Sequence, residues 1–190
     1  MIILLLGLVL FVAVHSVRVV ADGWRTAQIA RLGLMSWKGI YSLVSVAGFV
    51  LIVWGYGETR GGVELWQGPV WLRPVSSLLM LASFILLAAA YIPRNRIQTA
   101  IGHPMTAGVK VWALAHLMTN TRPGDLVLFG VLLVWAVWVF RAARRRDRAS
   151  GRREPPGSWP MAAVAMIVGA TAWAVFARFL HPILIGVPVA

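Results

Sequence analysis

The sequence predicts an all-α membrane protein, a polytopic bundle of about six transmembrane helices. Hydrophobic residues make up 59% of the 190 residues and charged residues only 13%, whereas about a quarter of a soluble domain is charged. The mean hydropathy is +0.78. The chain also holds ten tryptophans, a residue that concentrates at membrane–water interfaces.

The apolar residues come in long blocks, and a transmembrane helix needs about 20 of them in succession. The first block follows the initial Met1, and the third and sixth begin at Pro74 and Pro160, where proline suits the first turn of a helix. The fourth block is the shortest and most polar. We therefore predict one transmembrane domain over residues 1–190, with spans at 2–20, 38–56, 74–92, 104–119, 124–141 and 160–181. A short interfacial helix is expected at 22–33.

The positive charges predict the orientation of these spans. The three segments that follow the first, third and fifth spans hold 13 cationic residues when the adjoining span ends with Arg18, Lys38 and Arg141 are included, and the other two connecting loops hold 3. Seven of the 13 are arginines of the run 141–153, which we interpret as a solvated loop. Because cytoplasmic loops are enriched in Lys and Arg, we expect the basic loops in the cytoplasm and both termini outside. Without a crossing at 104–119, the run 141–153 would face the opposite side.

Several classes of function are disfavoured by the same composition. We assign the net charge of +12 to membrane loops and to their contact with membrane lipid. A nucleic-acid-binding surface is not expected, because no soluble domain is predicted. The chain has no cysteine, which excludes disulfides and thiolate metal sites. The acidic residues lie outside the predicted spans, apart from Asp125 at the very start of the span 124–141, so paired-carboxylate catalysis is not expected: Asp22, Glu58, Glu64, Asp125, Asp147 and Glu154.

Two histidines fall well inside predicted spans, whereas His103 and His181 lie at or near span ends. His15 lies about two-thirds of the way along the first span, and His116 lies about two-thirds of the way along the fourth. The helical rise of 1.5 Å per residue converts these positions into depths in the membrane. Because these spans run in opposite directions, both imidazoles are expected near the middle of the membrane. Two buried histidines on different helices are what a bis-imidazole haem requires. A proton relay, a divalent-metal site or simple packing would use the same pair.

Other residues near the histidines have both a functional and a packing interpretation. Gly108 and Trp112 share a helical stripe with His116, so they could flank a flat cofactor, or Gly108 could only allow close helix packing. Arg18, one turn after His15, could pair with a haem propionate or serve as an orientation charge. Lys110 is expected to extend to the membrane surface. His103 and His181 each precede a proline and are secondary candidates, since both could simply mark helix ends.

Three motifs resemble one protein family. "HPMTAGVKVWALAHLMTN" (103–120), "VHSVR" (14–18) and "LHPILIGV" (180–187) are similar to segments of the NnrU family, as is the pattern of about six spans. The resemblance covers essentially the whole chain. It implies a bacterial inner-membrane protein linked to denitrification, that is, to the expression or activity of nitrite and nitric oxide reduction.

The resemblance also implies a cofactor. The family is similar to plant zeta-carotene isomerase, a membrane haem b protein whose haem histidines match His15 and His116 here. The isomerase carries a cysteine three residues before the second histidine, and Ala113 stands at that position in this chain. A thiolate ligand is therefore absent, and haem b would have the two histidines alone.

The sequence leaves other functions open. One is a structural or assembly factor for a nitrite or nitric oxide reductase system, without a cofactor. Another is a membrane enzyme, either an isomerase or a methyltransferase with His103 near its cofactor. "GHPMTAG" (102–108) keeps the His-Pro of isoprenylcysteine-type methyltransferases but lacks their Arg and Tyr. The oligomeric state is not indicated by the sequence.

Overall fold

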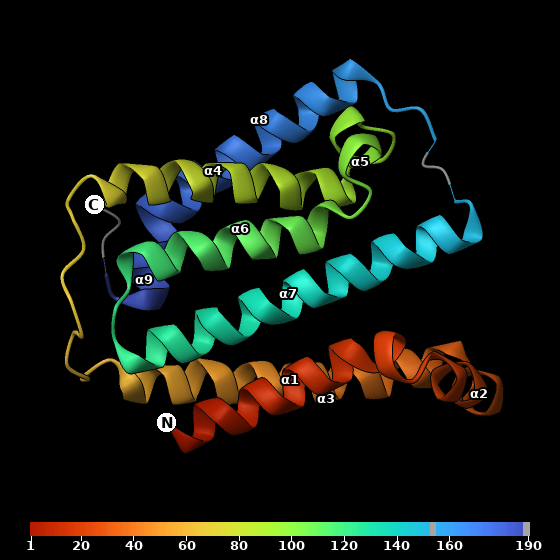
Figure 1. The fold of residues 1–190 in the computed structure, drawn as a ribbon, viewed down its shortest axis with the longest axis horizontal. Coiled ribbons are helices and arrows are strands. Elements are labelled where there is room, and N and C mark those ends of the chain that lie inside the picture. The colour runs from red at the N-terminus through yellow and green to blue at the C-terminus, as the bar shows by residue number, and fades with distance from the viewer. Residues whose placement is uncertain (153–154, 188–190) are drawn as a thin grey trace. The chain divides into compact units, whose positions relative to one another are not determined.

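A computed structural model describes residues 1–152 and 155–187. The regular elements of these residues are all helices, which confirms the all-α class (Figure 1). Within the described residues, five helical segments are long and apolar enough to cross a membrane: Ile2–Val20, Leu34–Thr59, Leu72–Tyr91, Pro123–Ser150 and Trp159–Ile185. Each contains or closely matches one predicted span. The chain forms two compact units, which are described separately.

The first unit comprises Met1–Gln67 and Asn120–Trp135. It holds α1 (Ile2–Val20), the short α2 (Asp22–Leu32), α3 (Leu34–Thr59) and the first half of α7 (Pro123–Ser150). Helices α1 and α3 run side by side (Figure 1). Their backbones approach closely because glycines lie at the contact. A Cβ built on Gly7 would lie 2.6 Å from the backbone nitrogen of Ile52, and one on Gly48 would lie 2.9 Å from that of Phe11.

The start of α7 is fixed to α3 by a buried polar pair. The hydroxyl of Tyr56 donates to Oδ1 of Asp125 at 2.7 Å, and Oδ2 of Asp125 accepts from the backbone nitrogen of Arg122 at 3.0 Å. The second bond is one half of a capping box, in which the third helical residue reaches back to the residue before the helix. Asp125 is 6% exposed, so both bonds satisfy a carboxylate that burial would otherwise destabilise.

The second unit runs from Gly68 to Thr119 and from Ala136 onward. It contains α4 (Leu72–Tyr91), α5 (Arg96–Ile101), α6 (Pro104–Thr119), the second half of α7 and α8 (Trp159–Val175). A π-helical turn, η1 (Phe176–Leu180), then leads into α9 (His181–Ile185). Helix α4 lies along α6, and it also packs against α8 (Figure 1).

Two buried serines of α4 attach α6 to it. Ser76 donates to the carbonyl of Ala115 at 2.8 Å, and Ser83 donates to the carbonyl of Gly108 at 2.9 Å. The buried face of α6 consists of small residues, among them Ala107, Gly108, Ala113 and Ala115. Small residues let two helices approach closely enough for such side-chain-to-backbone bonds.

Two predictions about helix ends need correction, and one predicted crossing stays a prediction. The run 141–150 is helical and continues α7, because arginine and alanine are good helix formers; Arg153 and Glu154 lie outside the described residues. His181 does not end its span, since the helical path continues to Ile185. Helix α6 has the predicted bounds but only 16 residues, so it is not among the five candidate spans.

Candidate functional site

His15 lies on α1 within a group of aromatic side chains of the first unit. Its ring centroid is 4.0 Å from that of Phe11, 5.3 Å from that of Tyr41 and 6.0 Å from that of Trp135. The contacts to Tyr41 and Trp135 are edge-on, the favoured arrangement for aromatic pairs. Three helices therefore orient one half-buried imidazole.

The tautomer of His15 follows from its hydrogen bond. Nδ1 lies 2.7 Å from the carbonyl oxygen of Phe11, four residues earlier on the same helix. A carbonyl oxygen only accepts, so Nδ1 must carry the hydrogen. In the neutral ring, Nε2 then carries the lone pair. A metal-binding histidine is typically arranged in this way, with its other ring nitrogen donating to a carbonyl or a carboxylate.

His116 on α6 has the same local arrangement in the second unit. Its Nδ1 lies 2.9 Å from the carbonyl oxygen of Trp112, also four residues earlier. The ring of Trp112 lies 5.0 Å from the imidazole, centroid to centroid. The sequence placed Trp112 on the same stripe as His116, and the structure brings these two side chains together.

The two other residues predicted at the cofactor lie in different surroundings. Gly108 is buried against α4, where an added Cβ would come within 3.1 Å of Leu87 Cγ. The structure thus gives Gly108 a role in helix packing. Arg18 lies in the last turn of α1 and is exposed.

The two secondary candidate histidines have partners of their own. Nε2 of His103 lies 2.7 Å from Oδ2 of Asp147 on α7, and the carbonyl of His103 accepts the first helical bond of α6. Nδ1 of His181 donates to the carbonyl of Val187 at 2.7 Å. His103 therefore also marks the start of a helix, as the following proline indicated.

Two functional contacts were missed by the sequence analysis. Asp147 was assigned to a solvated loop, whereas it pairs with His103. Trp135 donates from Nε1 to Ser16 Oγ at 3.0 Å, which holds its indole beside His15. Only the i, i+3 and i, i+4 spacing along α7 could have indicated which of its residues share a face. Within the described residues, no three His, Asp or Glu side chains come together as a metal site.

Comparison with known proteins yields one match. No curated protein and no solved structure is significantly similar to this chain. The family described as "NnrU protein" matches residues 3–189, nearly the whole length. That range contains His15, His116 and all the helices described above except Ile2, the first residue of α1. The chain therefore belongs to the NnrU family.

Proposed function

We propose that this chain is an integral membrane protein that binds haem b through His15 and His116. The observation that carries the proposal is the matching arrangement of the two imidazoles. Each Nδ1 donates to the carbonyl four residues earlier, at 2.7 Å for His15 and 2.9 Å for His116. Each ring therefore has Nε2 as its ligating nitrogen.

The residues around the two histidines fit such a cofactor. Phe11, Tyr41 and Trp135 surround His15, and the indole of Trp112 lies beside His116. Aromatic side chains offer the flat apolar surfaces against which a porphyrin packs. A haem b held by two imidazoles supplies one-electron transfer. The protein's part is to fix the tautomer and the orientation of each ring.

The first test is a reduced-minus-oxidised absorption spectrum of the purified full-length protein after expression with ample haem. The proposal expects sharp b-type bands, which His15→Ala and His116→Ala each abolish. His181→Ala is the matched control and should keep them, because His181 bonds to Val187 near the chain end. A folded but colourless wild-type protein would overturn the proposal and leave a cofactor-free assembly factor as the favoured function.

Loss of the bands in a variant could reflect misfolding, so a rescue experiment separates the two causes. His116→Gly opens space for free imidazole at the place of the lost ring. Added imidazole should restore the bands in this variant and leave the His181→Ala spectrum unchanged. If the bands do not return although the variant elutes and melts like the wild type, His116 is not an iron ligand.

We further propose that the protein supports nitrite or nitric oxide metabolism in the bacterial inner membrane. The family resemblance supports this role. Deletion of the gene should slow nitrite or nitric oxide consumption by whole cells grown without oxygen. Wild-type protein should restore the rate, and His116→Ala at equal abundance should not. If His116→Ala fully restored the rate, the physiological role would not depend on this histidine.

The proposed topology has six crossings, with α6 as the fourth. At 1.5 Å per residue its length is about 24 Å, somewhat less than the hydrocarbon thickness of about 30 Å. Bilayer thinning or snorkelling of flanking residues accommodates such a difference at modest cost. The distribution of positive charges supports the crossing, because it brings all the basic segments to one side.

The absence of cysteine allows a clean test of this topology. Single cysteines at Ser36 near the start of α3, at Gly61 after its end and at Ser150 at the end of α7 report on three levels of the chain, and all three positions are exposed. Six crossings predict that a membrane-impermeant maleimide labels Gly61→Cys in intact spheroplasts. Ser36→Cys and Ser150→Cys should react only after permeabilisation. Labelling of Ser150→Cys in intact spheroplasts would show that α6 does not cross.

A further inference from the structure

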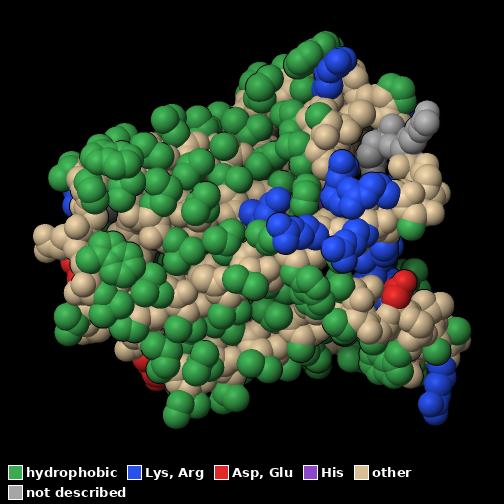
Figure 2. Space-filling model, viewed as in Figure 1, with side chains coloured by type: hydrophobic (Ala, Val, Ile, Leu, Met, Phe, Trp, Pro, Cys, Tyr) green, Lys and Arg blue, Asp and Glu red, His purple; other side chains and the backbone are tan. Residues whose placement is uncertain are grey.

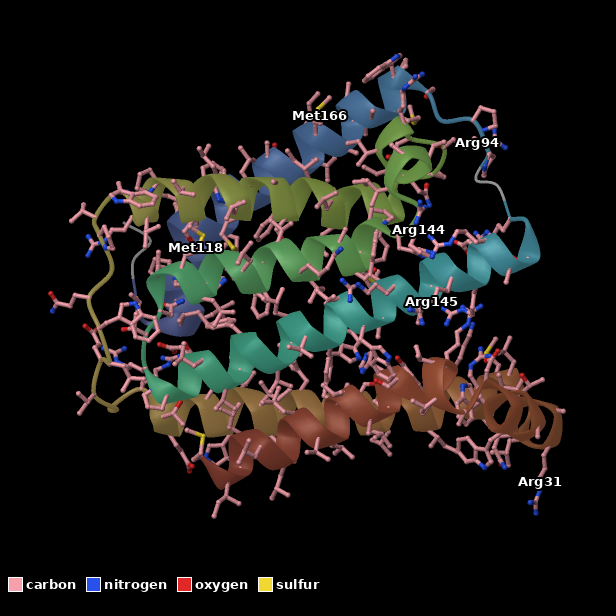
Figure 3. All side chains as sticks on the ribbon, in the orientation of Figure 1. Arg31, Arg94, Met118, Arg144, Arg145 and Met166 are labelled. Atoms are coloured by element: carbon pink, nitrogen blue, oxygen red, sulfur yellow. The ribbon has the colours of Figure 1, made fainter. Side chains whose placement is uncertain are left out.

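The second half of α7 carries an open pocket that the proposed haem function does not use. The pocket has a volume of ≈ 350 Å³ and is lined by Phe140, Arg141, Arg144, Arg145 and Arg148. Arg144 and Arg145 are neighbours, and each lies three or four residues from both Arg141 and Arg148. The four arginines therefore share one face of the helix. Figure 3 shows Arg144 and Arg145 projecting from α7, and Figure 2 shows Lys and Arg side chains gathered in one patch.

The arginines of this pocket have no carboxylate partner within the part of the chain that the structure describes. All four are exposed, and across residues 1–152 and 155–187 no carboxylate lies within 4.0 Å of their guanidinium groups. The neighbouring Asp147 is engaged by His103 at 2.7 Å. Like charges at four-residue spacing destabilise a helix. The pocket therefore favours an external anion.

The pocket lies where the apolar part of α7 ends. Residues 126–140 are entirely apolar, and Arg141 is the first charged residue after them. Nζ of Lys110 on α6 lies 3.5 Å from the ring centroid of Phe140, which adds a further cation at the same level. In a membrane-spanning helix, this boundary between apolar and charged residues is the level of the lipid headgroups.

We propose that this pocket binds the phosphate group of an anionic phospholipid such as phosphatidylglycerol. Guanidinium groups bind phosphate oxygens in a bidentate manner, and basic pockets next to membrane helices suit anionic headgroups. Trp138 precedes Arg141 and Arg145 on the same stripe and is 42% exposed. An acyl chain can lie along this apolar surface while the phosphate contacts the arginines.

Free phosphate shares the chemistry of the headgroup, so the experiment must separate the two sources. The full-length protein is delipidated in detergent and mixed with equal amounts of phosphatidylglycerol and phosphatidylcholine of the same acyl chains. Native mass spectrometry then counts the lipids retained on each protein. Wild type should retain phosphatidylglycerol in preference, and Arg144→Gln/Arg145→Gln should lower its affinity about tenfold or more.

A matched control loses the same charge elsewhere. Arg31 and Lys38 are both exposed, and Arg31→Gln/Lys38→Gln should retain phosphatidylglycerol like the wild type. An equal loss in the two double variants would indicate general charge attraction and overturn the proposal. If Arg144→Gln/Arg145→Gln fails to fold, Arg141→Gln/Arg148→Gln tests the same pocket from its two ends.

The phosphate arm completes the test. Inorganic phosphate is added alone to lipid-free protein, at the concentration at which the lipid binds. No phosphate should remain on the protein in the mass spectrum. One combination of results would show that the lipid proposal is wrong. The wild type would retain phosphate, Arg144→Gln/Arg145→Gln would lose it, and the wild type would bind phosphatidylglycerol and phosphatidylcholine equally. Retention of phosphatidylglycerol by both pocket variants at the wild-type level would also contradict it.

Discussion

Nε2 of His103 lies 2.7 Å from Oδ2 of Asp147, and this contact fastens the first turn of α6 to the arginine-rich end of α7. The side chains are 24% and 19% exposed, so water screens the pair only partly. The ring of Phe140 lies edge-on to His103, 6.2 Å between centroids. The contact therefore combines a hydrogen bond and ring packing at the start of α6.

Replacement of Asp147 by asparagine should lower the melting temperature of the detergent-purified protein. A hydrogen bond of this kind contributes about 1 kcal/mol, which corresponds to about 2–4 °C for a chain of this length. Intrinsic tryptophan fluorescence during heating measures the change. Asp22→Asn is the control, because its pair with Arg25 is more exposed and longer, at 3.4 Å. Equal shifts in the two variants would show that the His103 contact adds no stability.

The pair formed by Tyr56 and Asp125 allows a sharper test, since it is more deeply buried. Tyr56→Phe removes the donor at 2.7 Å and leaves Oδ1 of Asp125 unpaired at 6% exposure. An unsatisfied buried group costs about 1–3 kcal/mol. The free energy of unfolding in mild detergent, titrated with a denaturing detergent, should fall by that amount.

Tyr91→Phe is the control for this substitution. Tyr91 is 77% exposed at the end of α4, so loss of its hydroxyl should leave the unfolding curve unchanged. If Tyr56→Phe also leaves it unchanged, the backbone nitrogen of Arg122 alone satisfies the carboxylate.

The spans were predictable because hydropathy reports where apolar residues begin and end. The predicted 2–20 and 104–119 agree with α1 and α6. The end of α7 was predicted nine residues too early because a run of arginines stops an apolar pattern without stopping a helix. Backbone propensity, in which arginine and alanine rank high, decides where such a helix ends.

The candidate site was predictable only along single helices. The spacing of four between Trp112 and His116 predicted their contact, and the structure confirms it. The surroundings of His15 could not be predicted, because Tyr41 and Trp135 lie 26 and 120 residues away in sequence and only tertiary packing brings them to α1. Periodicity says which face a residue shares, but it does not say which helix covers that face.

Asn95 is the most deeply buried polar side chain near a helix start, with 0% exposure. Its Nδ2 donates to the carbonyls of Ala89 and Ile92, at 2.8 and 2.5 Å, while Oδ1 accepts from the backbone nitrogen of Gln98. Asn95→Asp keeps the acceptor but loses both donors and adds a charge facing two carbonyl oxygens. It should lower the yield of folded protein sharply, as measured by monodisperse elution from a sizing column.

The matched control for Asn95 is Gln98→Glu, which makes the same chemical change at a half-exposed position nearby. Surface substitutions of this kind alter stability by about 0.5 kcal/mol or less. Yields that fall equally for both variants would mean that added negative charge, rather than the lost donors of Asn95, is responsible.

The glycine contact between α1 and α3 gives the strongest expected effect on packing. A Cβ on Gly55 would collide with the backbone nitrogen of Leu4 and lie 2.7 Å from the backbone carbon of Ile3, whereas a Cβ on Gly57 would meet nothing within 4 Å. Backbone atoms cannot move aside as a flexible side chain can. Gly55→Ala must therefore push the two helices apart, at a cost of about 1–3 kcal/mol.

Gly57→Ala uses the same substitution on the same helix and provides the control. Without a collision, alanine should be neutral or stabilise α3 by up to about 1 kcal/mol, because glycine is the poorer helix former. Thermal unfolding of the two variants in the same detergent should therefore shift in opposite directions or by clearly different amounts. Equal melting temperatures would mean that α1 and α3 are not in close backbone contact at Gly55.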